Sequence, residues 1–445
     1  MPVVRKQAEV VVVGTGPGGA SVARELARAG VKVALLERGR DHRQAWYYGT
    51  HLGGMLYSHR GGLFFSREGI QIVRPLMVGG ATSMYCGSAA DPPGWLRDRY
   101  GIDLGDYARS IAQELKIAPL PPELRGVAST RIAEAAAALG QDWRPQPKFM
   151  DPSRSRRFDC GAKCMLGCRC RSKWEAAEWV DEAVAAGAEL ITEARVTEVL
   201  RAEGAAAGVR ATWQGGRQLE VEAPIVVLAA GGLGSIHVLR SSAVADLGTG
   251  MAMDTTVIVY GRSSHPGTAN EPPMTWSYSD PERGFMLSTL HDPWLLYPVI
   301  AGLGDWRRAF TWLDWGHLLG VMIKLKDDLV GEVLPDGSVS KPFTKEDSLR
   351  LDHAVGVARR ILSQAGADES SIYVSTPRGT HPSATVRLGE ALDQNLQTAL
   401  PGLYVCDASV FPESLDQPTV LTILAFGRRL ADHLLQRRLA RAPVR

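Results

Sequence analysis

A glycine-rich turn between an apolar run and a helical segment places the strongest constraint on the fold. Residues 10–13 read VVVV, which suits a parallel strand buried on both faces. Gly14, Gly16 and Gly19 then follow the spacing G-x-G-x-x-G. The first glycine permits a tight turn, the second lets a pyrophosphate approach the backbone, and the third allows the helix to pack closely on the strand. This order predicts a dinucleotide-binding α/β unit.

An acidic residue strengthens this prediction. Glu37 ends the second predicted strand, about twenty residues after the glycines, where a carboxylate suits a ribose diol. Arg38 follows it and is assigned to the same predicted site. The alternative is a glycine turn in an α/β unit that binds no ligand.

Composition sets the class of protein. The chain has 445 residues, of which 45% are hydrophobic and 22% charged, as in soluble globular proteins with two large domains or one domain carrying an insertion. A net charge of +2 does not favour a nucleic-acid partner. The sequence shows neither a signal peptide nor an apolar run of about eighteen residues, so we predict a cytoplasmic protein without a transmembrane segment.

Three later segments add motifs of the same kind. VGGATSMYCG at residues 78–87 joins two glycines to hydroxyl side chains, and VVLAAGGLGSIHVLRSS at 226–242 repeats the order of strand, glycine turn and helix. GLYVCDASVFPESLDQPTVLTILAFGRRLADHLL at 402–435 reads as a strand, a turn and a long helix. Together with the opening stretch, and in the same order along the chain, these segments resemble the signatures of the glucose–methanol–choline (GMC) oxidoreductase family.

The resemblance implies an α/β fold in which a Rossmann-like FAD-binding domain is interleaved with a substrate domain built on a mainly antiparallel sheet. We assign residues 1–100, 155–250 and 370–445 to the FAD-binding domain, and 101–154 and 251–369 to the substrate or cap domain. The strand-like, tryptophan-rich stretch from 251 to 345 supplies the antiparallel sheet, and a helix is predicted over 346–366.

The resemblance also implies where FAD binds. Residues 79–83 are expected on the flavin side, Val196 near the adenine through its backbone, residues 407–408 near the ribityl and pyrophosphate, and 418–420 along the pyrimidine edge. Non-covalent binding is expected because GGATSMYCG lacks the family's usual covalent histidine. The full predicted set is Gly14, Gly16, Gly19, Glu37, Arg38, Gly79, Gly80, Thr82, Ser83, Val196, Ala230, Gly231, Asp407, Ala408, Pro418, Thr419 and Val420.

Two residues are candidates for catalysis. GTHPSATVRLG at 379–389 resembles the family's H-P-x-G-[GT] stretch, which makes His381 the expected base for a hydroxyl proton. The alternative is a histidine before proline in a surface turn. Gln417 precedes the proline of DQPTVLT, where the family has asparagine or histidine. A glutamine is no base, but its amide can orient a hydroxyl or carbonyl beside His381.

Four cysteines are crowded into CGAKCMLGCRC at residues 160–170, namely Cys160, Cys164, Cys168 and Cys170. Their spacing differs from that of a bacterial ferredoxin run and from paired zinc knuckles. Some flavin dehydrogenases of the GMC family hold an iron–sulfur cluster with clustered cysteines, so the resemblance makes these four candidate cluster ligands. The alternatives are packed free thiols that shape a loop, or redox-active thiols.

The tryptophans of residues 292–320 have two interpretations. We expect them in a core or between domains, and the alternative is the wall of an apolar pocket or a membrane-surface contact. His291 and His317 lie nearby without an assigned role.

Three functions remain open on the sequence. The first is oxidation of a small or apolar alcohol by hydride transfer to flavin N5, by a dehydrogenase with an unidentified electron acceptor rather than by an oxidase. The second is reduction of a ketone or alkene with electrons from a partner or a cysteine-bound cluster, which Gln417 and the cysteines motivate. The third is FAD binding without catalysis.

Overall fold

The computed structural model describes residues 3–242, 244 and 247–441, and the VVVV run forms the middle of a parallel sheet. Five strands follow the order β22–β12–β2–β3–β8, and every neighbouring pair is parallel. These strands are β2 (Val10–Val13), β3 (Val33–Leu36), β8 (Glu189–Ile191), β12 (Ile225–Leu228) and β22 (Leu403–Val405). The four valines of β2 are at most 6% exposed, which confirms the predicted buried strand.

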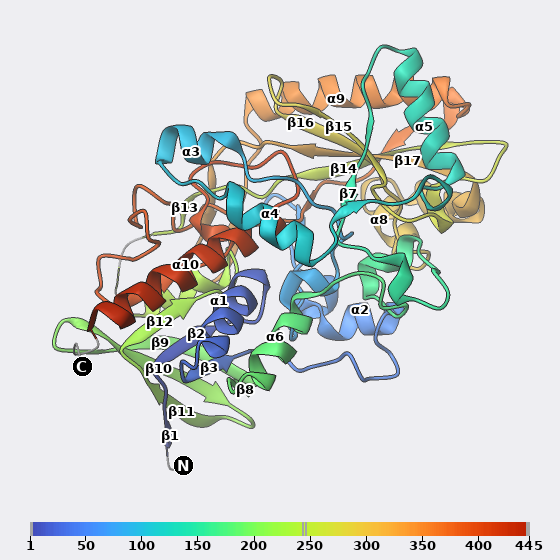
Figure 1. The fold of residues 1–445 in the computed structure, drawn as a ribbon. Helices are drawn as coiled ribbons and strands as arrows, with labels where there is room; N and C mark the ends of the chain where they lie inside the picture. Colours follow the sequence, from blue (N-terminus) through green and yellow to red (C-terminus); the bar gives the residue numbers. More distant parts are fainter. Residues whose placement is uncertain (1–2, 243, 245–246, 442–445) are drawn as a thin grey trace.

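Three helices pack together beside this sheet. α1 (Pro17–Arg28) contacts both α6 (Ala176–Ala185) and α10 (Val420–Arg441), and Figure 1 shows α1 next to α10 beside the parallel strands. Pro17 occupies the first turn of α1, where its missing N–H costs no helical hydrogen bond.

A second, smaller sheet packs beside the parallel sheet. Its order is β1–β11–β10–β9, from β1 (Val4–Gln7), β11 (Arg217–Glu222), β10 (Ala205–Trp213) and β9 (Ala194–Ala202). β9 begins three residues after β8 ends, so its first residues remain close to the carboxyl end of the parallel sheet.

The third sheet has eight strands and is largely antiparallel. The order is β4–β21–β14–β17–β16–β15–β6, with β20 also paired to β14. The strands are β4 (Gln71–Ile72), β6 (Arg144–Pro145), β14 (Thr256–Arg262), β15 (Trp276–Asp280), β16 (Phe285–Thr289), β17 (Leu318–Leu325), β20 (Tyr373–Val374) and β21 (Arg378–Gly379). The predicted antiparallel sheet is confirmed.

The two faces of this sheet carry different side chains. Val257 and Val259 of β14 pack with α5 (Val127–Ala138) and α9 (Lys345–Gln364), which cover one face in Figure 1. Ile258 and Tyr260 point to the other face, because side chains alternate along a strand. α9 confirms the helix predicted over 346–366, within two residues at each end.

The remaining elements are short. The other helices are α2 (His51–Tyr57), α3 (Gly94–Tyr100), α4 (Gly105–Glu114), α7 (Gly234–Ser241) and α8 (Tyr297–Gly304), with 3-10 segments that include η5 (Ala162–Leu166), η6 (Thr268–Asn270) and η7 (Trp306–His317). The other strands are β5 (Ala118–Pro119), β7 (Pro147–Lys148), β13 (Thr249–Met251), β18 (Gly331–Val333) and β19 (Val339–Ser340). Within the described residues, every helix falls short of the length and apolar character that crossing a membrane requires.

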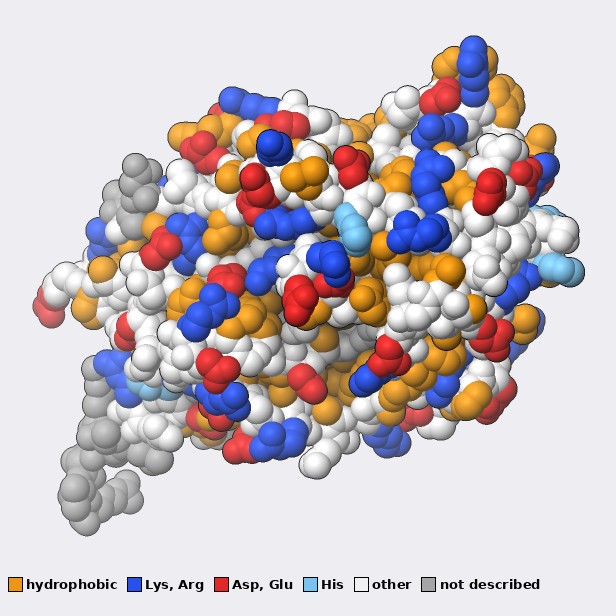
Figure 2. Space-filling view, turned by 90° about the horizontal axis from the view of Figure 1, so that it is seen from above, with side chains coloured by type: hydrophobic (Ala, Val, Ile, Leu, Met, Phe, Trp, Pro, Cys, Tyr) orange, Lys and Arg blue, Asp and Glu red, His pale blue; other side chains and the backbone are white. Residues whose placement is uncertain are grey.

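The surface carries both charges. Figure 2 shows lysine, arginine and acidic side chains interspersed with apolar ones over the face seen from above. That face therefore presents no field of a single sign, in keeping with the net charge of +2. The domain boundaries predicted from the sequence stay a prediction.

Candidate active site

The glycine turn after β2 is shaped by close backbone contacts. Gly14 has φ of +104°, and a Cβ atom there would lie 2.3 Å from the carbonyl oxygen of Ala229. A Cβ on Gly19 would lie 2.0 Å from Gly14 O, so the third glycine permits the helix to approach the turn. A Cβ on Gly16 would meet no atom within 4 Å. Gly16 therefore faces open space, and it lines a pocket with Gly14.

This pocket extends along the carboxyl end of the parallel sheet. Residues from β2, β3 and β9, and from the segments that follow β2, β3, β12 and β22, line it. The predicted cofactor residues found in its lining are Gly14, Gly16, Glu37, Arg38, Gly80, Val196, Ala230, Gly231, Asp407, Ala408, Thr419 and Val420. Gly19, Gly79, Thr82, Ser83 and Pro418 are not in the lining.

Glu37 ties the turn to the second strand. Its Oε2 accepts hydrogen bonds from the backbone N–H of Thr15 at 3.1 Å and from the Thr15 hydroxyl at 2.6 Å. Its Oε1 accepts from the N–H of Gly39 at 2.8 Å. Burial raises the pKa of this carboxyl group, and the hydrogen bonds partly oppose that shift. The ribose contact predicted for Glu37 stays a prediction.

Three arginines give the pocket a positive charge. Arg38, Arg74 and Arg195 line it, and none of their guanidinium groups has a hydrogen-bond or ion-pair partner among the described residues. Burial lowers the pKa of Arg74 to about 10, and Arg38 and Arg195 add to the shift. Burial also lowers the pKa of Arg38, with Arg195 again contributing. Such unpaired cations suit a ligand that carries phosphates.

The sequence interpretation missed Arg74 and Arg195. A signal was present, because Arg195 directly precedes Val196, and Arg74 lies five residues before Gly79. Their arrival in one pocket depends on the path of the chain between β4, β9 and the glycine turn, which no local pattern reveals.

Residues 78–83, which read VGGATS, contribute both lining residues and buried supporting residues to the pocket. A Cβ on Gly80 would lie 3.0 Å from the Cα of Gly16, so the two segments touch through their backbones. Thr82 is fully buried; its hydroxyl donates to Gly79 O at 2.6 Å and accepts from Ala176 N at 2.9 Å. Thr82 thus fastens the loop to the start of α6.

Asp407 organises the opposite wall. Its Oδ2 accepts from Gly231 N at 2.9 Å and from the Ser235 hydroxyl at 2.5 Å, and its Oδ1 accepts from Ser409 N at 2.8 Å. Burial raises the pKa of this carboxyl group, and the hydrogen bond from Ser235 opposes the shift. Asp407 therefore links the turns that follow β12 and β22 at the edge of the pocket.

His381 lines the same pocket at the end that lies beside the eight-stranded sheet. Its Nδ1 lies 3.1 Å from the Thr380 hydroxyl and 3.4 Å from Oδ2 of Asp254, a residue that is 1% exposed. Burial lowers the pKa of His381, the ammonium of Lys324 lowers it further, and Asp254 opposes both. The ring is thus favoured in its neutral form, with Nε2 as the nitrogen not engaged by these neighbours.

The side chain of Gln417 makes a different contact from the one that the sequence predicted. Its amide nitrogen donates to Asp91 O at 2.7 Å, and Gln417 is not among the residues that line the pocket. Its backbone carbonyl accepts a hydrogen bond from Lys324 at 2.5 Å. The catalytic role of Gln417 stays a prediction, because this arrangement does not place its amide in the pocket.

The clustered cysteines lie in η5 and the loop on either side of it, beside α2. The Sγ atoms of Cys168 and Cys170 are 3.7 Å apart, and Cys170 Sγ lies 3.0 Å from the Ser172 hydroxyl. All four thiols are free. Within the described residues, no group of three or more histidine, cysteine or acidic side chains is arranged to hold a metal ion. The structure therefore does not support the predicted iron–sulfur cluster at Cys160, Cys164, Cys168 and Cys170.

The tryptophans of residues 292–320 are only partly buried. Trp312 and Trp315 pack, as expected, against the apolar cluster on the face of the eight-stranded sheet that carries Ile258 and Tyr260. Trp294 and Trp306 are 43% and 68% exposed, so the prediction of core packing is wrong for these two. They flank α8, a short apolar helix that the sequence analysis did not predict.

Comparison with known proteins agrees with this arrangement. Models of GMC oxidoreductases match residues 68–255 and 342–427, and a model of an FAD binding domain matches residues 7–46. An uncharacterised GMC-type oxidoreductase of Mycobacterium tuberculosis is 26% identical, over 96% of this chain and 75% of its own. A long-chain-alcohol oxidase of Arabidopsis thaliana is 23% identical, over 95% of this chain and 66% of its own.

Solved structures extend the likeness to the fold. The crystal structure of pyridoxine 4-oxidase from Mesorbium loti superposes with a TM-score of 0.73 at 15% identity, over 96% of this chain and 99% of that one. The fold and the pocket define an FAD-dependent oxidoreductase. The chain belongs to the glucose–methanol–choline (GMC) oxidoreductase family.

Proposed function

We propose that this protein oxidises an alcohol to a carbonyl compound, with His381 as the base. The observation that carries the proposal is the position of His381 in the same pocket as the glycine turn, with Nδ1 beside Asp254 and Thr380. Nε2 is then available to a substrate hydroxyl. When bound, FAD supplies a hydride acceptor at N5, so the alcohol carbon loses a hydride while its oxygen loses a proton.

The chain offers groups that fit FAD. The first turn of α1 has N–H groups without a side-chain cap, and Gly16 leaves open space in front of it, which suits a diphosphate. The guanidinium groups of Arg38, Arg74 and Arg195 balance phosphate charge. We propose that Glu37 binds near the ribose and that Gly80 and Asp407 bind toward the flavin.

A neutral His381 suits the proposed role. The lowered pKa leaves the imidazole unprotonated near neutral pH, so that Nε2 accepts the hydroxyl proton as the carbon gives up its hydride. The Asp254 carboxylate then stabilises the imidazolium that results. This division of roles requires no base from Gln417.

The substrate is proposed to be apolar beyond its hydroxyl group. Thr256, whose hydroxyl lies 3.5 Å from that of Thr380, stands opposite Lys324 in the pairing of β14 with β17. The next pair on the same face is Ile258 with Met322, which belongs to the apolar cluster of this sheet face. An apolar surface therefore starts beside His381, and the similarity to a long-chain-alcohol oxidase supports the same substrate class.

The acceptor of electrons is proposed to be a molecule other than oxygen. The names of similar proteins include both oxidases and a 2-methyl-1,2-propanediol dehydrogenase from Mycolicibacterium austroafricanum, so the family alone does not favour either. Reoxidation of the reduced protein distinguishes an oxidase from a dehydrogenase. Rapid reoxidation by air identifies an oxidase, and reoxidation by a quinone or dye but not by air supports the proposal.

Anaerobic mixing tests the reaction itself. The FAD-loaded protein is mixed with primary and secondary alcohols of increasing chain length, and the loss of flavin absorbance is followed. We expect bleaching that becomes faster with chain length, and a loss on the order of 10²-fold or more in His381→Gln. The exposed His265, which lies outside the pocket lining, supplies the control, since His265→Gln should keep the rate constant of bleaching.

Two results would reject the proposal. If only an external reductant bleaches the flavin and a ketone or alkene restores its colour, the protein is a reductase. If alcohols bleach the flavin equally fast in wild type and His381→Gln, the base lies elsewhere.

A further inference from the structure

Lys324 is a buried cation beside the candidate base. It is 3% exposed, and its Nζ lies 2.9 Å from Oδ2 of Asp254 and donates to Gln417 O at 2.5 Å. The register of β14 and β17 places it opposite Thr256, at the end of the strand nearest His381. The ammonium thus joins the segment before β14 to the segment before α10.

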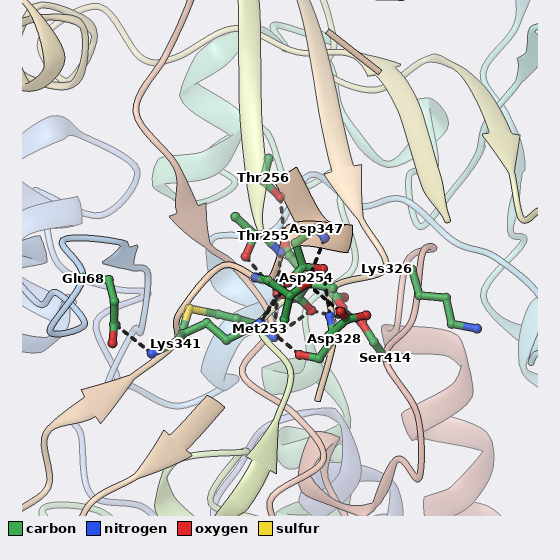
Figure 3. A network of polar contacts seen from close by, with 12 residues as sticks. Glu68, Met253, Asp254, Thr255, Thr256, Lys326, Asp328, Lys341, Asp347 and Ser414 are labelled. Carbon is green, nitrogen blue, oxygen red and sulfur yellow. Dashed lines mark hydrogen bonds and ion pairs between the residues drawn. The ribbon is translucent and has the colours of Figure 1, made fainter. Parts of the chain in front are cut away.

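A second buried carboxylate holds Asp254 in place. Asp327 accepts hydrogen bonds from the backbone N–H groups of residues 253–255 at 3.2–3.3 Å and from the Thr255 hydroxyl at 2.8 Å. Asp254 has φ of +49°, a conformation that aspartate tolerates better than most residues. Asp254 lies in the middle of the polar network in Figure 3, and the Ser414 hydroxyl donates to its Oδ1 at 3.3 Å. Its side chain has little freedom to turn away from His381.

The orientation of Asp254 leaves one acceptor directed at the imidazole. Within the described residues, no aligned hydrogen bond reaches Oδ2 of Asp254, although Lys324 approaches it as an ion pair. An unsatisfied buried acceptor is costly. The Nδ1 atom of His381 is 3.4 Å away, a distance that tightens readily when a ligand fills the pocket.

We propose that Asp254 and Lys324 form a positioning pair that sets the tautomer and the protonation state of His381. Asp254 holds the proton on Nδ1, so that Nε2 carries the lone pair that faces the substrate. Lys324 balances the charge of Asp254. The carboxylate therefore orients the ring without raising the pKa of His381 so far that the imidazole becomes protonated. This inference rests on the proposed function, in which His381 is the base.

Charge balance explains why both residues are present. A carboxylate alone beside an imidazole favours the imidazolium, which accepts no proton. An ammonium alone disfavours the imidazolium that forms during the reaction. A buried ion pair is weak evidence for stability, because apolar side chains of similar size often serve as well. Its contact with a pocket histidine points instead to a role in the chemistry.

Two further charged groups near this end of the pocket are each paired with a counter-charge rather than with His381. Arg378, on the strand that leads to His381, forms two hydrogen bonds with Asp292 at 2.5 and 3.1 Å. Behind Asp254, the Asp327 carboxylate lies 3.5 Å from the ammonium of Lys341. The charged groups that act directly on the His381 ring are therefore Lys324 and Asp254.

The pH dependence of anaerobic flavin reduction by an alcohol tests the pair. Without the ammonium, the uncompensated Asp254 raises the pKa of His381. The rising limb of the pH–rate profile should therefore move to higher pH in Lys324→Met. Without the carboxylate, Lys324 lowers that pKa, so the limb should move to lower pH in Asp254→Asn. We expect shifts of about 1 pH unit or more in opposite directions, and a lower maximal rate in Asp254→Asn.

A direct titration keeps this test separate from the proposed function. Carbon-13 labelling of histidine, with His381→Gln to assign the signal, reports the pKa of His381 in the oxidised holoenzyme by NMR. Opposite shifts by NMR with no matching change in the kinetics would uphold the pair and reject His381 as the base. Shifts in the same direction, or none, would overturn the inference.

Matched variants guard against loss of folding. Lys324→Arg keeps the charge and should leave the limb close to that of wild type. Lys148→Met removes an equally buried amine whose partners are the Ser88 hydroxyl and the carbonyl oxygens of Cys86 and Pro273, away from Asp254. It should lower stability but leave the limb in place. FAD content and thermal unfolding, measured for each variant, identify any that does not fold.

Discussion

The Oε2 atom of Glu37 lies 2.6 Å from the hydroxyl oxygen of Thr15, and it also accepts the backbone N–H of Thr15. One carboxylate thus joins the end of β3 to the glycine turn after β2, inside the pocket that the turn lines. The shape of the turn depends on an acceptor at that position. FAD binding should therefore depend on the chemistry of Glu37 as well as on its size.

Replacing Glu37 with glutamine should weaken FAD binding. An amide can direct its oxygen to Thr15 or to Gly39 but not to both, so at least one of these N–H groups loses its acceptor. We expect the Kd for FAD to rise about tenfold or more, since one lost hydrogen bond to a charged group costs about 1.5–3 kcal/mol. Fluorescence titration of the apoprotein measures this. Glu282→Gln, an exposed acid, is the control, and an unchanged Kd in Glu37→Gln would contradict the prediction.

The first two glycines of the turn should respond differently to alanine. Gly14→Ala introduces a Cβ 2.3 Å from Ala229 O at a φ of +104°, which should cost about 2–6 kcal/mol of folding free energy. Gly16→Ala meets no protein atom and has an ordinary φ of −65°, so the apoprotein should lose less than about 1 kcal/mol.

FAD binding provides the second half of that comparison. In Gly16→Ala the added methyl group occupies the open space in front of α1, so FAD affinity should fall while apoprotein stability is retained. Denaturant unfolding of the apoprotein and FAD titration give the two numbers. Normal FAD affinity in Gly16→Ala would show that no phosphate approaches this glycine.

Removal of an unpaired arginine should have opposite effects on the apoprotein and on the complex. Arg74 is crowded by Arg38 and Arg195, and burial lowers its pKa to about 10. Arg74→Met relieves this repulsion, so the apoprotein should become more stable, while the Kd for FAD should rise about tenfold or more because a phosphate partner is lost. Thermal unfolding with and without FAD measures both effects. The exposed Arg67→Met is the control, and equal FAD affinity in Arg74→Met would refute the phosphate contact.

His291 should make the stability depend on pH. It is 2% exposed, and burial lowers its pKa to about 4, from the ordinary histidine value of 6.5. The unfolded chain therefore binds more protons between these two values. The free energy of unfolding should fall by about 3 kcal/mol as the pH drops from 6.5 to 4, with no further loss from this group at lower pH.

A phenylalanine at this position isolates the contribution of the imidazole. His291 packs against Tyr260, Tyr297 and Trp315, contacts that a phenyl ring preserves, while its Nδ1 contact with Asp292 O is lost. His291→Phe should be less stable at pH 7 but should lose less on acidification than wild type. Urea unfolding at several pH values measures the free energy of unfolding of both proteins. If it falls equally with pH in wild type and His291→Phe, His291 is not the source of the acid loss.

Local patterns predicted the parts of this protein that depend on neighbours in the sequence. The VVVV strand, the glycine turn and the helix after it follow from buried apolar runs and from φ values that only glycine adopts comfortably. The helix over 346–366 was predicted within two residues at each end, and the structure shows that it begins with a capping box formed by Thr344 and Asp347.

Patterns that depend on distant partners were less informative. The density of the cysteines suggested a metal centre, yet ligand geometry depends on where the loop around η5 directs each thiol. The position of Gln417 before a proline suggested a catalytic amide, whereas the fold directs that amide to Asp91. Side-chain direction in loops depends on contacts from elsewhere in the chain, so a motif match gives residue type and spacing but not orientation.

The sequence by itself therefore determined the α/β unit, the likeness to GMC oxidoreductases and the histidine that lines the pocket. Only the tertiary structure decided which groups surround that histidine. Asp254 precedes His381 by 127 residues, and Lys324 lies on a strand between them. They meet because β14 pairs with both β17 and β21, and pairing between strands is set by the packing of a whole sheet rather than by any local run of residues.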